Sequence, residues 1–351
     1  MPKTFVKIPT LLKIGSGEIS NIGKCLKRSS FDNIACFYSK GIEELFGEKI
    51  NNSLDEYNIK VLHKDVIDEI DIENIIHTAF KIPKKVDALV GVGGGKALDY
   101  SKYCAHVLGL PFISVPTSTS NDGFCSPNSS LLVEKKRKSV TATIPYGVVV
   151  DIDIIKSSPD ICIFSGIGDL ISKITAEHDW LSSARKHKED FSDFSYLIAQ
   201  NSVLDILNYK DADYRNENFL YKLVVSLLMN GLSMEIAGSS RPASGSEHLI
   251  SHALDSLANE PQMHGIQVGV MTYLCSYLQN NQFETVKSFL TSIGFFDFVA
   301  TKPFVKSELI QAIKKAPEIK ENFYTILSEE NSLSRAIAFI ESDETMKKLV
   351  K

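Results

Sequence analysis

The stretch VDALVGVGGGKALDYSK, residues 86–102, reads as a hydrophobic strand that runs into a glycine cluster and then into a helix. Gly91, Gly93, Gly94 and Gly95 allow the backbone to approach a bound group closely, and N–H groups at a helix start receive phosphate. The strict dinucleotide pattern GxGxxG is absent because position 96 is Lys96, and the phosphate-loop pattern also fails. A turn without a ligand is the alternative, but four glycines in five positions exceed what a turn alone needs.

On both sides of this turn, short apolar runs alternate with amphipathic stretches up to about residue 153. This alternation predicts crossover units and a mostly parallel sheet, which binds its ligand beyond the carboxyl ends of the strands. The segment SSLLVEKKRKSVTAT, residues 129–143, is typical of a hairpin, and YGVVVDID, residues 146–153, reads as the closing strand.

After residue 153 the alternation stops, and long stretches show the apolar spacing of helices. We therefore expect an α/β, Rossmann-like parallel-sheet domain over residues 1–153, followed by an all-α domain over residues 154–351. Without a low-complexity linker, the two halves should pack directly with a cleft between them, where a ligand is favoured.

Composition narrows the class of partner. A net charge of −5 without a concentrated Lys/Arg block argues against nucleic acid, whose binding depends on neutralising phosphates. The sequence shows no secretory signal and no window of eighteen apolar residues, so we expect no membrane insertion. Six cysteines without a CxxC pair suit reduced thiols. We expect a cytoplasmic protein that binds a small molecule.

A second candidate loop, residues 114–130, follows the next strand and reads SVPTSTSNDGFCSPNSS. Small hydroxyl residues such as Thr117 and Ser120 can hydrogen-bond the phosphates or ribose of a cofactor, and Asp122 can orient a substrate hydroxyl or relay a proton. A solvated loop with turn-capping side chains is the alternative.

Three histidines and one aspartate are candidate metal ligands. His248 and His252 lie one helical turn apart in GSEHLISHALD, and His264 precedes a glycine in QMHG. Catalytic metals commonly take three protein ligands, so a carboxylate is also expected, and Asp169 in SGIGDLISK is the best candidate. Taken alone, a helical histidine pair is more often packed or solvated, and an Asp in this position often caps a helix.

Five motifs together resemble one family. GVGGGKALDYSK, VPTSTSNDG, GIGDLISK, GSSRPASGSEHLISHALD and MHGIQVGV are similar to the sn-glycerol-1-phosphate dehydrogenases, whose superfamily includes glycerol dehydrogenase, iron-type alcohol dehydrogenases and 3-dehydroquinate synthase. The resemblance covers about residues 85 to 275. It implies a dehydroquinate synthase-like fold, an NAD or NADP cofactor, one divalent metal and a role in phospholipid metabolism.

The resemblance also assigns roles to residues. It implies that Asp169, His248 and His264 hold the metal, with His252 on the substrate side or behind the ligands, and that Asp122 handles the substrate hydroxyl. The pyrophosphate and nicotinamide contacts would fall on these residues: Gly93, Gly94, Gly95, Lys96, Thr117 and Ser120.

The substrate question depends on a phosphate contact. Arg241 lies seven residues before the first metal histidine, where dehydroquinate synthases also have arginine and glycerol dehydrogenases do not. A guanidinium offers two parallel donors to phosphate, so we predict that Arg241 anchors the substrate phosphate, assisted by Lys173. The alternative for Arg241 is a structural salt bridge.

We therefore predict reversible reduction of dihydroxyacetone phosphate to sn-glycerol 1-phosphate, with the metal as a Lewis acid on the carbonyl. We expect the metal to be zinc, with nickel and iron as alternatives. Ser39 and Lys40 stand where an acid would grip the ribose of NAD, so NADP is not repelled. A homo-oligomer is expected. The rival interpretations are a glycerol dehydrogenase, a dehydroquinate synthase-like cyclase and an inactive cofactor-binding regulatory protein.

Overall fold

The computed structural model describes residues 5–209 and 211–351 and divides the chain into two compact units that meet in the sequence at Pro159 and Asp160. The first is a parallel-sheet unit and the second is helical, which confirms the predicted fold class. The junction lies six residues beyond the predicted end at residue 153, because helix α5 (Ile152–Ser157) still packs on two strands of the sheet.

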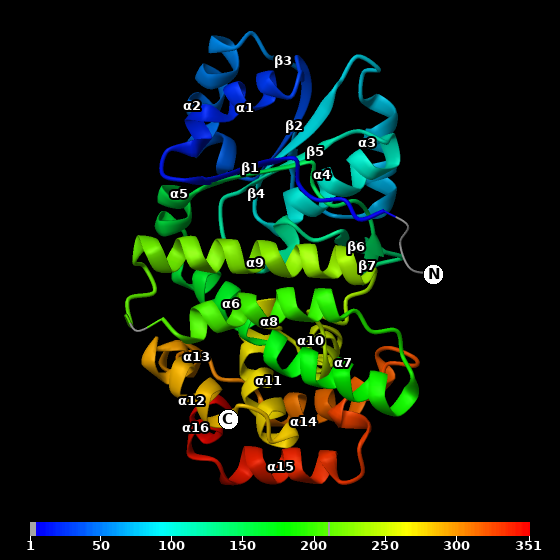
Figure 1. The fold of residues 1–351 in the computed structure, drawn as a ribbon, viewed down its shortest axis with the longest axis vertical. Coiled ribbons are helices and arrows are strands. Elements are labelled where there is room, and N and C mark those ends of the chain that lie inside the picture. Colours follow the sequence, from blue (N-terminus) through cyan, green and yellow to red (C-terminus); the bar gives the residue numbers. More distant parts are fainter. Residues whose placement is uncertain (1–4, 210) are drawn as a thin grey trace. The chain divides into compact units, whose positions relative to one another are not determined.

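The sheet unit contains six parallel strands (Figure 1). In spatial order they are β1 (Leu11–Gly15), β8 (Gly147–Asp151), β5 (Phe112–Pro116), β4 (Ala88–Gly93), β2 (Asn33–Ser39) and β3 (Lys60–Ile67). The alternating pattern predicted five of these strands. It missed β1, whose five residues LLKIG carry too short an apolar run to signal a strand, although each of them pairs with a residue of β8.

Helices cover both faces of this sheet, and for that reason its central strands are buried on both sides. On β2, Ile34, Cys36 and Tyr38 face the apolar side chains of two helices, whereas Phe37 points the other way and contacts Tyr100. The helices of this unit are α1 (Ile22–Arg28), α2 (Ile42–Glu56), α3 (Ile72–Lys81), α4 (Gly95–Leu108) and α5, with short 3-10 turns η1 (Glu18–Asn21) and η2 (Asp122–Phe124).

The strand order places a switch point beside the glycine cluster. From β2 the chain continues to β3 on one side, whereas from β4 it continues to β5 on the other side. In sheets of this kind, ligands bind outside the carboxyl ends of the strands at such a point. The glycine turn after β4 and Ser39 at the end of β2 are therefore in the position where this topology binds a cofactor.

The predicted hairpin is present and is separate from the main sheet. Strands β6 (Asn128–Val133) and β7 (Lys136–Thr141) pair in antiparallel register. Their turn uses Glu134 and Lys135, both with positive φ, as expected for a two-residue hairpin connection.

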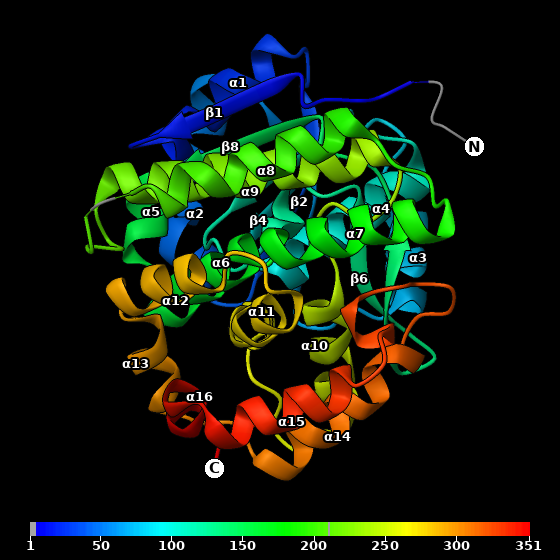
Figure 2. The same cartoon turned by 60° about the horizontal axis from the view of Figure 1, so that its bottom comes forward.

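The described residues of the second unit form helices and one isolated bridge between Phe304 and Val350. Helix α11 is almost entirely buried and packs against α6, α7, α10, α12 and α15; Figure 2 shows it nearly end-on among them. The helices are α6 (Asp160–Ile171), α7 (Lys173–His187), α8 (Asp193–Leu207), α9 (Glu217–Ala237), α10 (Ser246–Leu257), α11 (His264–Gln279), α12 (Phe283–Ser292), α13 (Phe295–Ala300), α14 (Lys306–Lys315), α15 (Ser332–Ser342) and α16 (Glu344–Leu349), with 3-10 turns η3 (Ala316–Glu318) and η4 (Ile326–Ser328).

One helix of the described part of the chain, α9, has the length and apolar composition that could cross a membrane. Within its most apolar window, 67% of the residues are buried inside the protein. That degree of burial is typical of a core helix.

Candidate active site

Three predicted ligands come together in the helical unit. Asp169 lies near the end of α6, His248 in the first turn of α10 and His264 at the start of α11. One potential ligand atom from each residue lies within 4.8 Å of the other two. Asp169 and His248 are buried, and His264 is half-buried.

Two glycines allow α6 and α11 to cross closely enough to form this cluster. A Cβ atom on Gly168 would lie 2.0 Å from the carbonyl oxygen of Gly265, and one on Gly265 would lie 1.8 Å from that of Ser165. The amide of Gly265 also donates to Ser165 Oγ at 3.1 Å. Each glycine is adjacent in sequence to a ligand, so the close crossing brings Asp169 beside His264.

The charges of the cluster favour an ionised carboxylate. Lys173 Nζ and His248 Nε2 lie 3.4 and 3.6 Å from Asp169 Oδ1. Burial raises the pKa of Asp169, but the nearby Lys173 and His248 lower it, and the net shift is downward. Burial lowers the pKa of His248, whereas the neighbouring carboxylates of Asp169 and Glu247 raise it, and the net shift is upward.

The donor set fits a divalent transition metal. Two imidazoles and one carboxylate suit zinc, iron and nickel, and three protein ligands leave room in the coordination sphere for substrate or water. A trio of one acid and two histidines that converge in a mostly buried position is unusual without such an ion, because the acid and its neighbours must otherwise lose hydration.

In the sheet unit, the glycine turn is shaped by contact between β4 and β2. Gly93 has φ of 144°, and a Cβ atom there would lie 2.2 Å from Ser39 Oγ. Ser39 Oγ accepts a hydrogen bond from the amide of Gly94 at 3.1 Å. Ser39 therefore stabilises the turn through this hydrogen bond, a role that the sequence did not indicate. Lys96 is exposed, and its Nζ contacts the carbonyl oxygen of Asp68 at 3.1 Å.

The predicted second loop lies beside the glycine turn, because β5 and β4 are neighbours. The amide of Thr117 donates to the carbonyl oxygen of Gly93 at 3.0 Å. Ser120 is half-buried, and Asp122 is the first residue of η2. Thr117 and Ser120 thus belong to the same edge of the sheet as the glycine turn.

Sequence reasoning missed Lys102, which holds this loop. Lys102 is fully buried on α4, and its Nζ donates to the carbonyl oxygens of Gly123 and Asn128 at 2.7 and 2.6 Å. Asp99, one turn earlier, lies 3.2 Å from the same Nζ. The spacing of an acid and a lysine three residues apart on a helix was the available signal.

Comparison with known proteins supports the resemblance. The family model for iron-containing alcohol dehydrogenase matches residues 13–159. A curated protein named glycerol-1-phosphate dehydrogenase [NAD(P)+], from Thermococcus sibiricus, is 34% identical over 325 residues, which are 91% of each chain. The chain belongs to the glycerol-1-phosphate dehydrogenase family. A second member, from Methanococcoides burtonii, is 33% identical and covers 93% of this chain and 92% of its own.

The fold agrees with this family assignment. The crystal structure of glycerol dehydrogenase from Schizosaccharomyces pombe matches 99% of this chain and 92% of its own, with a TM-score of 0.77 and 19% identity. At that identity the match shows the fold alone. It confirms the predicted architecture, a parallel-sheet unit followed by a helical unit.

Arg241 corrects one prediction about this family member. Its Nε and Nη2 donate to the two carboxylate oxygens of Glu189 at 2.6 and 2.5 Å, and its Nη1 donates to the carbonyl oxygen of Tyr324 at 2.9 Å. The guanidinium also lies 3.5 Å from the ring centroid of Phe323 and is 2% exposed. The predicted phosphate anchor is therefore a buried structural salt bridge, because its parallel donors already hold a carboxylate.

Lys173 corrects a second prediction. It is 0% exposed, and its Nζ lies within 3.4 Å of Asp169 Oδ1, Ser172 Oγ and the carbonyl oxygen of Ala243. A buried ammonium group requires such partners, and the carboxylate of Asp169 supplies the compensating negative charge. Lys173 thus compensates the charge of a metal ligand and does not reach outward to a substrate.

His252 lies beside the cluster but outside it. Its ring centroid is 6.3 Å from that of His248 and 5.8 Å from that of His264, and its side chain is exposed. The ligand atoms that converge belong to the other three residues. His252 therefore keeps its predicted position next to the ligands, and its contact with substrate stays a prediction.

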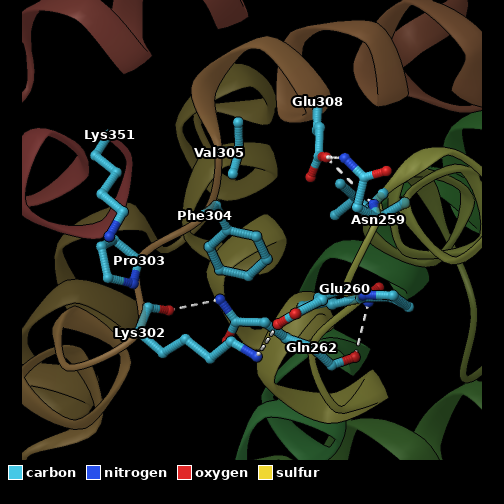
Figure 3. A pocket seen from close by; sticks show the side chains of 13 residues that line it. Asn259, Glu260, Gln262, Lys302, Pro303, Phe304, Val305, Glu308 and Lys351 are labelled. Atoms are coloured by element: carbon cyan, nitrogen blue, oxygen red, sulfur yellow. Dashed lines mark hydrogen bonds and ion pairs between the residues drawn. The ribbon is translucent and has the colours of Figure 1, made fainter.

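A separate pocket of about 310 Å³ opens where the segment between α10 and α11 faces the segment between α13 and α14 (Figure 3). Its polar side chains bind one another or the backbone: Gln262 Nε2 donates to the carbonyl oxygen of Lys302 at 2.7 Å, and Asn259 Nδ2 to Glu308 Oε1 at 2.9 Å. None of the metal-ligating trio lines it. We assign the chemistry to the trio and not to this pocket.

Proposed function

We propose that this protein interconverts dihydroxyacetone phosphate and sn-glycerol 1-phosphate with NAD(H) or NADP(H), using one divalent metal. The observation that carries the proposal is the convergence of Asp169, His248 and His264 within 4.8 Å in a chain of this family. Relatives named glycerol-1-phosphate dehydrogenase [NAD(P)+] support the substrate and both cofactors.

The sheet unit supplies the cofactor site in this proposal. The turn of Gly93, Gly94 and Gly95 places the N-terminus of the 14-residue helix α4 at the switch point, where its N–H groups and positive dipole end receive a pyrophosphate. Lys96 adds an exposed positive charge in the first turn of that helix. Ser39 stands where an acid would otherwise select NAD, so the site takes either cofactor.

The helical unit supplies the metal and substrate site. Asp169, His248 and His264 would hold a divalent cation, for which zinc is our first choice and nickel and iron the alternatives. When bound, the cation supplies Lewis-acid polarisation of a carbonyl oxygen, and the reduced nicotinamide supplies the hydride. His252 borders the same position, and we propose that it contacts the substrate.

Asp122 is our candidate for the residue that exchanges a proton with the substrate. It is half-buried at the start of η2, next to a turn whose carbonyl oxygens Lys102 holds in place. A fixed carboxylate is suited to exchange a proton with a substrate hydroxyl. Arg241 does not bind the substrate phosphate in this proposal, since its two parallel donors hold Glu189.

Turnover with matched substrates tests the proposal. Oxidation of NADH and NADPH is followed with dihydroxyacetone phosphate and with dihydroxyacetone, before and after chelation and after return of Zn²⁺ or Ni²⁺. The proposal requires metal-dependent turnover of the phosphorylated ketone. Turnover of dihydroxyacetone alone would move the assignment to glycerol dehydrogenase, and no turnover with any metal would favour a regulatory protein.

Cytoplasmic location and a homo-oligomer remain predictions. The six cysteines, all in the described part of the chain, form no disulfide, and five of them are buried. Reduced thiols support a reducing compartment.

A further inference from the structure

In each histidine of the metal site, the ring nitrogen that points away from the three ligand atoms has a hydrogen-bond partner. That partner determines which nitrogen faces the metal site. His248 Nδ1 lies 2.8 Å from Glu247 Oε1, and its Nε2 lies 3.6 Å from Asp169 Oδ1. A carboxylate accepts hydrogen bonds and does not donate them, and of these two contacts only the one with Glu247 is within hydrogen-bonding distance, so the proton of the neutral imidazole is on Nδ1. Nε2 of His248 then presents its lone pair beside Asp169.

Glu247 is itself fixed on several sides. It is 0% exposed, its Oε1 accepts from the amide of Gly245 at 2.6 Å, and its Oε2 lies 2.7 Å from Thr175 Oγ1. Thr175 Oγ1 also lies 2.9 Å from the carbonyl oxygen of Ser172. The side chain therefore has one orientation, and that orientation holds the ring of His248.

His264 has a neutral partner instead. Its Nδ1 lies 3.1 Å from Ser251 Oγ, which donates to Gln267 Oε1 at 2.7 Å. Gln267 Nε2 faces two acceptors, Asp255 Oδ1 at 3.1 Å and the carbonyl oxygen of Gln262 at 2.8 Å, so the amide oxygen must face Ser251. Ser251 gives its single proton to Gln267 and thus accepts from His264 Nδ1.

From this geometry we infer that Glu247 is the positioning residue of the metal site: it fixes the tautomer and ring orientation of His248 and strengthens that ligand. The inference rests on the metal site of the proposed function. Both histidines present Nε2, and the Nδ1 atom of His248 is backed by a buried carboxylate, whereas that of His264 contacts a hydroxyl. A charged partner makes an imidazole a stronger ligand than a hydroxyl does. Metal affinity therefore depends on Glu247 more than on Ser251.

The direct test is the affinity for Zn²⁺, measured by competition with a chromogenic chelator. Glu247→Gln removes the charge and keeps the shape: the amide oxygen can accept from His248 and Gly245, and the amide nitrogen can donate to Thr175 Oγ1. Glu247→Ala removes the contact as well. We expect affinity to fall about 10-fold for Glu247→Gln and about 100-fold for Glu247→Ala, the range for outer partners of metal ligands. Ser251→Ala should weaken binding less than Glu247→Gln.

Asp179 provides a matched control. It is equally buried and accepts from the amide of Ser246, one residue from Glu247, but the other groups that donate to it, Gln279 Nε2 and the amide of Ile326, are not histidine rings. Asp179→Asn should lower the melting temperature and leave the Zn²⁺ affinity unchanged. Equal loss of affinity in Asp179→Asn and Glu247→Gln would show a general structural effect and overturn the inference. Wild-type protein that binds no Zn²⁺ or Ni²⁺ would instead overturn the metal site itself.

The tautomer gives a readout that needs neither metal nor activity. Long-range ¹H–¹⁵N correlation spectra of the metal-free protein, with His248 assigned through His248→Gln, should show protonation at Nδ1 at a pH where the ring is neutral. In Glu247→Ala the ring should revert to a mixture that includes the Nε2-protonated form. Protonation of wild-type His248 at Nε2 would contradict the inference.

Discussion

Arg241 and Glu189 form a two-pronged salt bridge, with Nε–Oε1 and Nη2–Oε2 distances of 2.6 and 2.5 Å. Ser183 Oγ lies within 3.3 Å of the same guanidinium, and Phe323 stacks on it. The arginine is 2% exposed and the glutamate side chain 29%. The residue that the sequence offered as a phosphate anchor therefore joins three segments of the helical unit.

The first prediction concerns this pair. Arg241→Ala and Glu189→Ala should each lower the free energy of unfolding, and a double-mutant cycle in urea should give a coupling of about 1–3 kcal/mol. The ratio of the Michaelis constants for dihydroxyacetone phosphate and dihydroxyacetone should stay unchanged. If Arg241→Ala raised the Michaelis constant for dihydroxyacetone phosphate alone and left stability unchanged, Arg241 would be the phosphate-binding residue after all.

A second prediction tests the close crossing of α6 and α11. Gly265→Ala would place a Cβ atom 1.8 Å from a backbone oxygen, so it should cost at least about 2 kcal/mol of stability and reduce bound zinc. Gly47→Ala in α2 is the control, because its Cβ would meet only the flexible side chain of Glu43. Thermal unfolding and metal analysis measure both. Normal zinc content in Gly265→Ala would show that the crossing does not build the site.

The third prediction is a pH dependence of stability. Burial raises the pKa of Glu177 from 4.5 to about 9, with only partial compensation by Lys173. Between these two values the folded protein binds more protons than the unfolded chain, so this group makes stability fall as pH rises. Glu177→Gln removes that effect. The melting temperature of Glu177→Gln should exceed that of the wild type by little at pH 5 and by more toward pH 9. Each kcal/mol of difference in unfolding free energy corresponds to about 2–4 °C. A difference that does not vary with pH would contradict this.

The fourth prediction concerns the glycine turn. Gly93→Ala places a side chain on a residue whose φ is 144°, a value that residues other than glycine rarely adopt, and brings that side chain against Ser39. Strain of about 1.4 kcal/mol would weaken NADH about tenfold, as followed by fluorescence titration. Adding Ser39→Gly should recover part of the affinity, because it removes the clash and leaves the φ strain. Unchanged NADH binding in Gly93→Ala would remove the turn from the cofactor site.

Local patterns were sufficient where the structure is local. Alternating apolar runs predicted β2, β4 and the helices around them, since a strand covered on both faces must be continuously apolar. The five-residue β1 escaped because it lies at the sheet edge beside β8 and none of its residues is fully buried. The three metal ligands could be predicted because each lies in a motif that has a glycine or a second histidine nearby.

Contacts between distant segments were out of reach. Nothing near Arg241 in the sequence indicates that Glu189, 52 residues earlier, takes its two donors. Glu247 was also missed, because adjacent residues of a helix point in different directions, and their contact depends on how the side chains fold back. Both cases required the packing of the helical unit.

The most direct measurement is the initial rate of NAD⁺ and NADP⁺ reduction with sn-glycerol 1-phosphate, sn-glycerol 3-phosphate and glycerol, using protein stripped of metal and protein restored with Zn²⁺. We predict turnover of sn-glycerol 1-phosphate in the restored protein, with loss of activity on stripping and in His264→Ala. Turnover of glycerol or of sn-glycerol 3-phosphate in its place, or full activity without metal, would contradict the proposed function.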